Sequence, residues 1–338
     1  MSDILKIDPT IYKRSALPAV KGNSVAEDRL TLVVSTMCSV VGTGIVVRES
    51  SAELVLSDVA VWDDAQYATA ANRAGKDFYL YVIAGGGLLL SANATVPTGF
   101  TADTSRKIGG FHCECLSIGV ISGHDGSGWL TGDIIPTSIW DLLHRSPGIQ
   151  NGMAYVSPLQ EWWMIYLQSN TGANTASTFA ATITNSRNWM DFSDDLGAVG
   201  LRLPTDHGFQ IAAEGSNQQT NIMGSADPVT TGGHVDTAGR RMVSKYFLED
   251  CCGAVWQWLA DQSYQNDATY AGTFGYYALP GGKGQLYRQG AVGDVKLLAG
   301  GYWVTGAACG SQYRSANRAR WYTHTYLGAR GCARSRES

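Results

Sequence analysis

The sequence of 338 residues has no apolar run long enough to span a bilayer. Its most apolar window, residues 78–90, is too short and too rich in glycine for a transmembrane helix. The first 20 residues contain acids and prolines, whereas a signal peptide needs an uninterrupted apolar stretch. We therefore expect neither membrane insertion nor export by the ordinary secretory route.

Recognisable metal-binding spacings are also missing. Seven cysteines cannot all pair with one another, and neither Cys113 with Cys115 nor Cys251 with Cys252 has the spacing of a zinc site. The six histidines show no HExxH or comparable arrangement. We expect mostly buried, reduced thiols, as in a chain that folds in a reducing cytoplasm, and neither a metal nor any other cofactor.

Motifs of the common enzyme and nucleic-acid-binding classes are absent as well. The sequence has no nucleophile elbow and no phosphate-binding loop. The adjacent acids at 194–195 and 249–250 say nothing about the separation across a sugar that a glycosidase needs. With a net charge of −4 and no RNP, zinc-finger or basic-region pattern, the chain is not expected to bind nucleic acid.

The sequence does contain much glycine and many short apolar segments. Forty glycines and nine prolines, with only 16% charged residues, predict many short strands joined by turns. Hydrophobic residues make up 44% of the chain, which is ample for packed cores, and the length indicates two or three domains. The expected fold class is α+β and rich in β-structure.

The N-terminal part has the pattern of a β-sandwich or barrel. Residues 1–28 mix charge and proline without periodicity and look like an attachment or oligomerisation segment. Residues 29–147 contain β-branched runs closed by turn residues, with no helix expected to exceed the stretch 65–75. Within this part, residues 128–146 suit a passage from strand to helix, and the Ser-Pro-Gly sequence at 146–148 marks a boundary.

The C-terminal part, residues 148–338, has mixed patterns. We expect a strand pair within 152–169 and a helical or turn-rich connection at 185–196. A helix within 201–216 would start near Pro204, be capped by Thr205 or Asp206, and bury Phe209, Ile211, Ala212 and Ala213. The apolar residues Met242, Val243, Tyr246 and Phe247 have helical spacing and predict a helix. A strand-like segment is expected after it, at 255–258.

Aromatic and arginine side chains are concentrated in the last 38 residues. This tail contains six arginines and one acid, Glu337, and so carries a net charge of about +5 in an acidic protein. Tyrosine, tryptophan and arginine supply large contact areas for little loss of rotamer freedom, and they dominate the energetics of protein interfaces. We interpret the tail as a recognition face.

Three motifs of the C-terminal half resemble a known fold in the same order. The motifs RLPTDHGFQIAAEG (202–215) and GAVWQWLAD (253–261) resemble segments of formylglycine-generating-enzyme-like domains. The tail is similar to their closing segment, with a Gly-x-Trp opening, a Gly-Ser turn and a Gly-Ala-Arg ending. This resemblance covers roughly residues 150–338 and implies a C-type lectin fold.

A narrower resemblance is to bacteriophage major tropism determinants and related tail fibre proteins. It is carried by EDCCGAVWQWLAD (249–261), TGGHVDTAGRRMVS (231–244), LGARGC (327–332) and, in the N-terminal half, SRKIGGFHCEC (105–115). The resemblance implies an N-terminal trimerising β segment at 1–28, a β-sandwich at 29–147 and a C-type lectin domain at 148–338.

The same resemblance implies a function. The protein would be a non-enzymatic virion component, folded in the host cytoplasm, that binds a host-surface receptor, protein or glycan, through its C-terminal domain. It would be a homotrimer attached to other tail or baseplate proteins by its N-terminal region. The surface would be either fixed or diversified by a retroelement, and the low asparagine content of the tail, with Asn317 alone after residue 300, leaves both open.

Roles within the tail can be divided. Trp303, together with Trp256 and Trp258, is expected in the core, and Arg330 in a structural hydrogen-bonded pair. The residues expected to contact a receptor lie between these scaffold positions, with His324 as a further candidate. They are Gln312, Tyr313, Arg314, Ser315, Asn317, Arg318, Arg320, Trp321, Tyr322, Thr323 and Thr325.

The alternative function is that of a bacterial formylglycine-generating-enzyme-like protein outside a virion, either a copper oxidase or a binding module. Those enzymes hold copper with a close pair of cysteines near the C-terminus, because thiolates suit Cu(I). Here Cys309 and Cys332 are 23 positions apart and lie in different local contexts, so the close pair is missing. We expect Cys332 to be a buried thiol.

Overall fold

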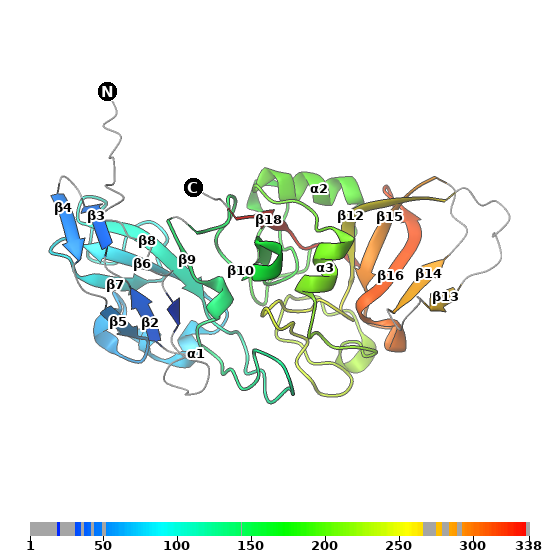
Figure 1. Ribbon diagram of the computed structural model, residues 1–338, viewed down its shortest axis with the longest axis horizontal. Coiled ribbons are helices and arrows are strands. Elements are labelled where there is room, and N and C mark those ends of the chain that lie inside the picture. The colour runs from blue at the N-terminus through cyan, green and yellow to red at the C-terminus, as the bar shows by residue number, and fades with distance from the viewer. Residues whose placement is uncertain are drawn as a thin grey trace, which may run out of the picture. The chain divides into compact units, whose positions relative to one another are not determined.

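A computed structural model describes residues 19–20, 31–34, 37–41, 44–48, 52–142, 144–265, 275–278, 284–288 and 293–335 (Figure 1). The chain divides into two compact units, one formed by residues 1–116 and 130–145 and the other by residues 117–129 and 146–336. The expected three-part division at residues 28 and 147 stays a prediction. Apart from residues 19–20, its first segment lies outside the described residues.

The N-terminal unit consists mainly of short antiparallel strands. One sheet has the order β1-β2-β5, formed by Ala19–Val20, Thr31–Val34 and Ala52–Val55, and a hairpin pairs β3 (Met37–Val41) with β4 (Gly44–Arg48). A four-stranded sheet has the order β7-β6-β8-β9, formed by Leu88–Ser91, Asp77–Ile83, Ser105–His112 and Trp140–Asp141. The expected short strands are confirmed.

The predicted passage into a helix at 128–146 is wrong. Its described residues contain only a 3-10 turn, Pro136–Ser138, and then strand β9. The chain forms a strand here because β9 pairs with Gly109 and Gly110 of β8 and extends the sheet. A Cβ at Gly110 would lie 2.8 Å from the Trp140 ring, so glycine at this position allows the large indole to lie against the neighbouring strand.

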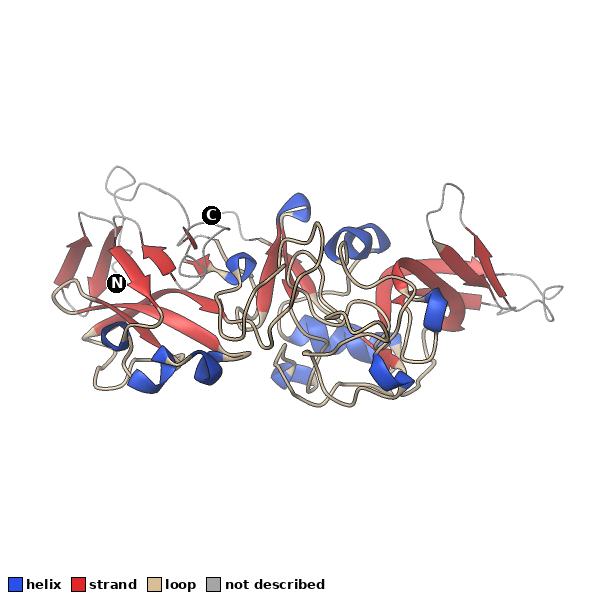
Figure 2. Cartoon of the chain, turned by 90° about the horizontal axis from the view of Figure 1, so that it is seen from below, coloured by secondary structure: helices blue, strands red, loops and turns tan. Residues whose placement is uncertain are grey.

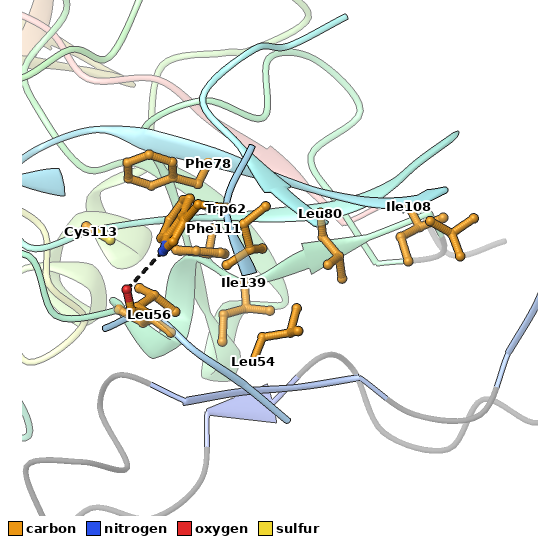
Figure 3. Close-up of a cluster of buried hydrophobic side chains, with 12 residues drawn as sticks. Leu54, Leu56, Trp62, Phe78, Leu80, Ile108, Phe111, Cys113 and Ile139 are labelled. Atoms are coloured by element: carbon orange, nitrogen blue, oxygen red, sulfur yellow. Dashed lines mark hydrogen bonds between the residues drawn. The ribbon is translucent and has the colours of Figure 1, made fainter. Parts of the chain in front are cut away.

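Trp62 is at the centre of the core of this unit. Its ring is 95% buried and meets Phe78 edge-on, with ring centroids 4.9 Å apart. Its indole Nε1 donates a hydrogen bond of 2.9 Å to the carbonyl of Leu56, as the dashed line in Figure 3 shows. The tryptophan therefore fills the space above the sheet without leaving a buried donor unpaired.

The C-terminal unit contains two sheets and much irregular chain (Figure 2). The first has the order β10-β11-β18, formed by Met153–Val156, Glu161–Met164 and Cys332–Arg334. The second has the order β13-β14-β16-β15-β12-β17, formed by Gly275–Ala278, Gln285–Arg288, Gly310–Ala319, Gly293–Gly300, Trp256–Gln265 and Leu327–Gly328. The antiparallel pair β10-β11 confirms the strand pair expected at 152–169.

Two α-helices and several 3-10 turns complete this unit. Helix α2 (Trp189–Ala198) begins at a capping box between Asn188 and Asp191, and α3 (Asp206–Ala212) is capped by the Thr205 hydroxyl. Phe209, Ala212 and Ala213 are buried as predicted, whereas Ile211 is half-buried. Over the described part of the chain, no helix has the length and apolar character that crossing a membrane requires.

The helix expected around Met242 to Phe247 is wrong, although all four apolar residues of that pattern are buried. Phe247 has φ of 65° and Asp250 has φ of 55°, values that interrupt a right-handed helix. Ser244 and Leu248 instead close a tight turn, since the Ser244 amide donates to the Leu248 carbonyl at 2.9 Å. The segment is enclosed by protein on several sides, so its apolar spacing reports burial and not helical structure.

Arg330 connects the irregular segments to the sheets. Its side chain is fully buried and donates to the carbonyls of Met164 at 2.6 Å and Ile165 at 2.5 Å, and to the carbonyl of Glu249. A further bond of 3.3 Å reaches Gln257 Oε1 on β12. The structural role predicted for Arg330 is confirmed, but its partners are mainly backbone carbonyls.

Removing the buried Arg330 guanidinium should lower the free energy of unfolding more than removing an exposed guanidinium does. In Arg330→Met, three buried carbonyls lose a donor. That of Ile165 keeps the Glu249 amide at 2.8 Å, and each group left unsatisfied costs about 1–3 kcal/mol. We expect the free energy of unfolding to fall by about 3 kcal/mol or more in urea titrations followed by tryptophan fluorescence. Arg334→Met, at an exposed position of β18, is the control and should change it by less than about 0.5 kcal/mol.

His234 and Asp250 form a second buried polar contact. The imidazole Nδ1 lies 2.9 Å from Asp250 Oδ2, and that carboxylate also accepts the Gly232 amide at 2.7 Å. Burial by itself lowers the pKa of His234, but attraction to the Asp250 carboxylate outweighs it and raises the pKa above 6.5. The charged imidazole is therefore favoured in the folded state.

The stabilisation by His234 should depend on pH. A pKa raised by folding contributes fully below the unfolded value of about 6.5 and is lost as the pH rises through the folded value. We expect His234→Gln to destabilise the protein more at about pH 5.5 than at about pH 8.5, measured by urea unfolding. His207→Gln, at an exposed position of α3, should show no such difference. A loss that grows toward alkaline pH would contradict the assignment.

Candidate functional site

Strand β16 positions the side chains of the candidate site. Its pairing with β15 matches Lys296 to Arg318 and Leu298 to Ser315, so β16 has one residue more than β15 between these pairs. Side chains of a regular strand alternate between the two faces, and residues three apart would lie on opposite faces. The bulge changes this alternation and allows Ser315 and Arg318 to line the same pocket.

The pocket has a volume of about 320 Å³ and lies on the six-stranded sheet and the segments that follow β15 and β16. Its walls are mainly aromatic: Trp256, Tyr276, Tyr287, Tyr302 and Tyr326. Polar groups come from Thr305, Ser315, Asn317 and Arg318, and Leu298 and Val304 complete the lining. In Figure 1, β15 and β16 run side by side in orange, with β14 and β13 beyond β16.

The aromatic rings of the pocket support one another. Tyr276 and Tyr287 face each other across β13 and β14, with centroids 4.9 Å apart and planes at 61°. Tyr302 contacts Tyr326 at 4.7 Å, and Tyr326 in turn stacks on His324 at 3.8 Å. Because these contacts fix the planes of the rings, the walls are held in place before any ligand arrives.

Among the described residues that line this pocket, Arg318 is the single charged one. Its Nη2 donates a hydrogen bond of 3.0 Å to the Tyr326 hydroxyl, and its guanidinium lies 4.4 Å from the centroid of the Tyr322 ring. The two tyrosine hydroxyls lie 3.1 Å apart. Arg318 is therefore oriented by two tyrosines and retains N–H donors for a further partner.

Tyr326, Tyr302 and Tyr276 are neutral at physiological pH. Burial, with the hydrogen bond to Tyr322, raises the pKa of Tyr326 to about 12. Burial also raises the pKa of Tyr302 and of Tyr276. None of these hydroxyls supplies a negative charge that could offset the guanidinium.

Residues 320–326 leave β16, turn and return to β17 with their backbone fixed at several points. The Trp189 amide donates to the Arg320 carbonyl at 2.9 Å, and the Ser186 amide donates to the His324 carbonyl at 3.1 Å. At the far end, the Trp256 amide donates to the Tyr326 carbonyl at 2.9 Å. The side chains of this segment are thus presented from a backbone held by main-chain hydrogen bonds.

The residues expected to contact a receptor differ in their exposure. Trp321, Thr323 and Thr325 are exposed, Trp321 by 62%. Gln312, Asn317, Arg318, Arg320 and Tyr322 are half-buried, and His324 is exposed. The receptor-binding role of these residues stays a prediction.

Tyr313, Arg314 and Ser315 are buried, whereas residues displayed on a surface would be exposed. Arg314 points to α3, where its Nε pairs with the Asp206 carboxylate and its guanidinium lies 5.3 Å from the centroid of Phe209. Its Nη1 donates to the carbonyls of Ser311 and Tyr313 at 2.8 and 2.9 Å. Arg314 therefore joins β16 to the helix, whereas Ser315 reaches the pocket from within.

Sequence reasoning missed most of the aromatic wall. Tyr276 and Tyr287 lie outside the tail, and only the pairing of β13, β14 and β16 brings them to it. Trp256 and Trp258 are buried as predicted, but Trp256 also forms part of the pocket. Trp303 is half-buried and packs against a buried cluster that includes Leu167 and Val255.

The six cysteines whose side chains the structure describes are buried thiols, as expected. Burial raises the pKa of Cys309 to about 12 and raises that of Cys332 as well. Thiols of this kind are protonated at neutral pH, and the thiolate is the form that binds metals and attacks substrates.

These features define a class: a β-rich, two-unit protein whose C-terminal unit presents an aromatic pocket and an exposed aromatic segment from a rigid scaffold. Residues 27–141 match the family described as the Mtd second domain. The tail fibre receptor-binding protein of Bordetella phage BPP-1 is 28% identical over 297 residues, which cover 79% of this chain and 73% of that protein.

Solved structures give the fold. The U1 and I1 variants of the Major Tropism Determinant each match with a TM-score of 0.72 at 24% identity, over 96% of this chain and 85% of theirs. The C-terminal unit thus has the C-type lectin fold of those proteins, as the tail motifs implied. Over most of its length the chain is therefore similar to a phage tail fibre receptor-binding protein and to variants of the Major Tropism Determinant.

Buried and exposed residues of the tail should respond differently to substitution. Arg314→Met leaves two buried carbonyls and the half-buried Asp206 carboxylate without their donor, so we expect a loss of about 2 kcal/mol of unfolding free energy. Trp321→Ala removes an exposed ring and should stay within about 0.5 kcal/mol of the parent. Equal losses in urea titrations would show that Trp321 belongs to the core.

Proposed function

We propose that the protein is a phage tail fibre component that binds a host-surface receptor through its C-type lectin domain. The observation that carries this proposal is the continuity between the exposed segment 321–325 and the pocket around Arg318. Tyr322 belongs to the segment and also packs against the Arg318 guanidinium. A receptor could cover the exposed rings and insert one group into the pocket in the same contact.

The composition of this surface suits recognition. Trp321 is the most exposed of the large hydrophobic side chains in the tail, and the surrounding residues offer tyrosine and arginine. Such residues give most of the binding energy at interfaces because they bury much area for little lost entropy. Exposed apolar rings rimmed by polar groups usually mark a binding surface.

We further propose the assembly and location that the homologues suggest. The protein would be part of the virion, would fold in the host cytoplasm and would be a homotrimer attached to other tail or baseplate proteins by its N-terminal region. It would have no enzymatic activity. Three weak sites on one fibre tip would act together as a strong binder if the receptors are spaced to allow simultaneous contact.

Attachment to host cells should depend on the rings of Trp321 and Tyr322. The double variant Trp321→Ala and Tyr322→Ala should reduce attachment of the purified protein to host cells by at least about 30-fold, because loss of one interface hot spot costs about 2 kcal/mol or more. Its melting temperature should stay near that of the parent. Gln210→Ala, at an exposed position of α3, serves as the matched control and should attach normally. Normal attachment of the double variant, with its fold intact, would rule out this surface.

A further inference from the structure

The Arg318 guanidinium is in an unusual electrostatic setting. Its one hydrogen bond goes to a neutral hydroxyl, and within the described parts of the chain no carboxylate pairs with it. The part of the pocket lining that the structure describes contains neither aspartate nor glutamate. Other arginines of this unit are paired with an acid, as Arg314 is with Asp206 and Arg241 with Glu249.

A cation held among aromatic rings without a counter-charge favours an anionic ligand. The planar guanidinium matches a carboxylate, which it can bind through two parallel N–H···O bonds. Desolvation by the surrounding rings strengthens that attraction relative to bulk water. The contacts of Arg318 with Tyr322 and Tyr326 hold the guanidinium in position, so little rotamer entropy is lost on binding.

The rest of the pocket suits a ring that carries hydroxyl groups. Several tyrosine faces enclose it, and apolar C–H groups of a ligand can pack on such faces. The Ser315 hydroxyl lies 2.6 Å from Asn317 Oδ1, which places a polar pair next to Arg318. Aromatic walls with a few convergent polar groups are the usual composition of a small-ligand site.

We propose that this pocket binds a carboxylate-bearing sugar residue, with the carboxylate on Arg318 and the ring against the tyrosines. The proposal rests on the proposed receptor-binding function and specifies the receptor as an acidic glycan. The volume of about 320 Å³ is at the lower end of the range for small-ligand pockets and fits a single sugar ring. The carboxylate of an aspartate or glutamate side chain would fill only a small part of it.

The test uses the full chain and free monosaccharides. Glucuronate, galacturonate and N-acetylneuraminate are titrated while the fluorescence of the protein is followed, because Trp256 lines the pocket. Glucose and galactose are the neutral controls. At least one acidic sugar should bind about 10-fold or more tightly than the neutral ones, since charge-assisted hydrogen bonds are the stronger kind. Equal binding, or none at all, would overturn the proposal.

Variants at two positions test the role of Arg318 itself. Arg318→Gln should remove the preference for the acidic sugar, and Arg318→Lys should restore part of it because the charge returns without the planar fork. Tyr326→Phe keeps the ring but removes the hydroxyl that accepts from Arg318, and it should weaken binding of the acidic sugar less than Arg318→Gln does. Full binding by a folded Arg318→Gln protein would exclude the assignment.

Two further measurements separate this proposal from the receptor-binding function. If the protein attaches to host cells but no acidic sugar binds or competes, the glycan proposal fails and receptor binding stands. If the protein does not attach to host cells at all, the proposed function itself fails. Tighter binding of N-acetyl-aspartate amide than of every acidic sugar would point to a carboxylate on a protein receptor and would also overturn the proposal.

Discussion

Arg330 donates to the carbonyls of Met164, Ile165 and Glu249 from a fully buried position, and two other buried arginines of the C-terminal unit, Arg241 and Arg314, also donate to main-chain carbonyls. This unit has long irregular segments, and irregular chain cannot pair its buried carbonyls within a ladder. A guanidinium has five N–H donors and can satisfy several carbonyls from different segments at once. In the N-terminal unit Arg73 does the same for the carbonyls of Leu56, Tyr67, Ala68 and Gly132.

Arginines therefore have two distinct roles in the last 38 residues. Arg330 and Arg314 are buried and hold the scaffold, one through carbonyls and the other through Asp206 on α3. Arg318 is half-buried, pairs with no acid among the described residues and lines the pocket. The bulge in β16 separates these roles, since it places Arg314 toward the helix and Arg318 toward the pocket.

Sequence patterns predicted the strands, the helix cap at Thr205 and the buried Trp258, because each depends on local residues. They failed where burial came from several directions: apolar spacing at 242–247 indicated a helix, and the chain there forms a turn. They also could not place Tyr276 and Tyr287 beside the tail, since that contact arises from strand pairing across long stretches. The exposed residues Trp321, Thr323 and Thr325 lie within the segment that the sequence indicates, but the burial of Tyr313 and Arg314 depends on contacts with distant parts of the chain, such as that of Arg314 with Asp206 on α3.

The segment 320–326 is held by amides of Trp189, Ser186 and Trp256 that donate to its own carbonyls. Main-chain bonds are independent of which side chains the segment carries. Replacing Trp321, Thr323 or Thr325 should therefore leave the path of the chain unchanged. Under the function proposed above, such substitutions would alter recognition alone, because specificity would be encoded by side-chain atoms and the path of the segment by main-chain atoms of the same residues.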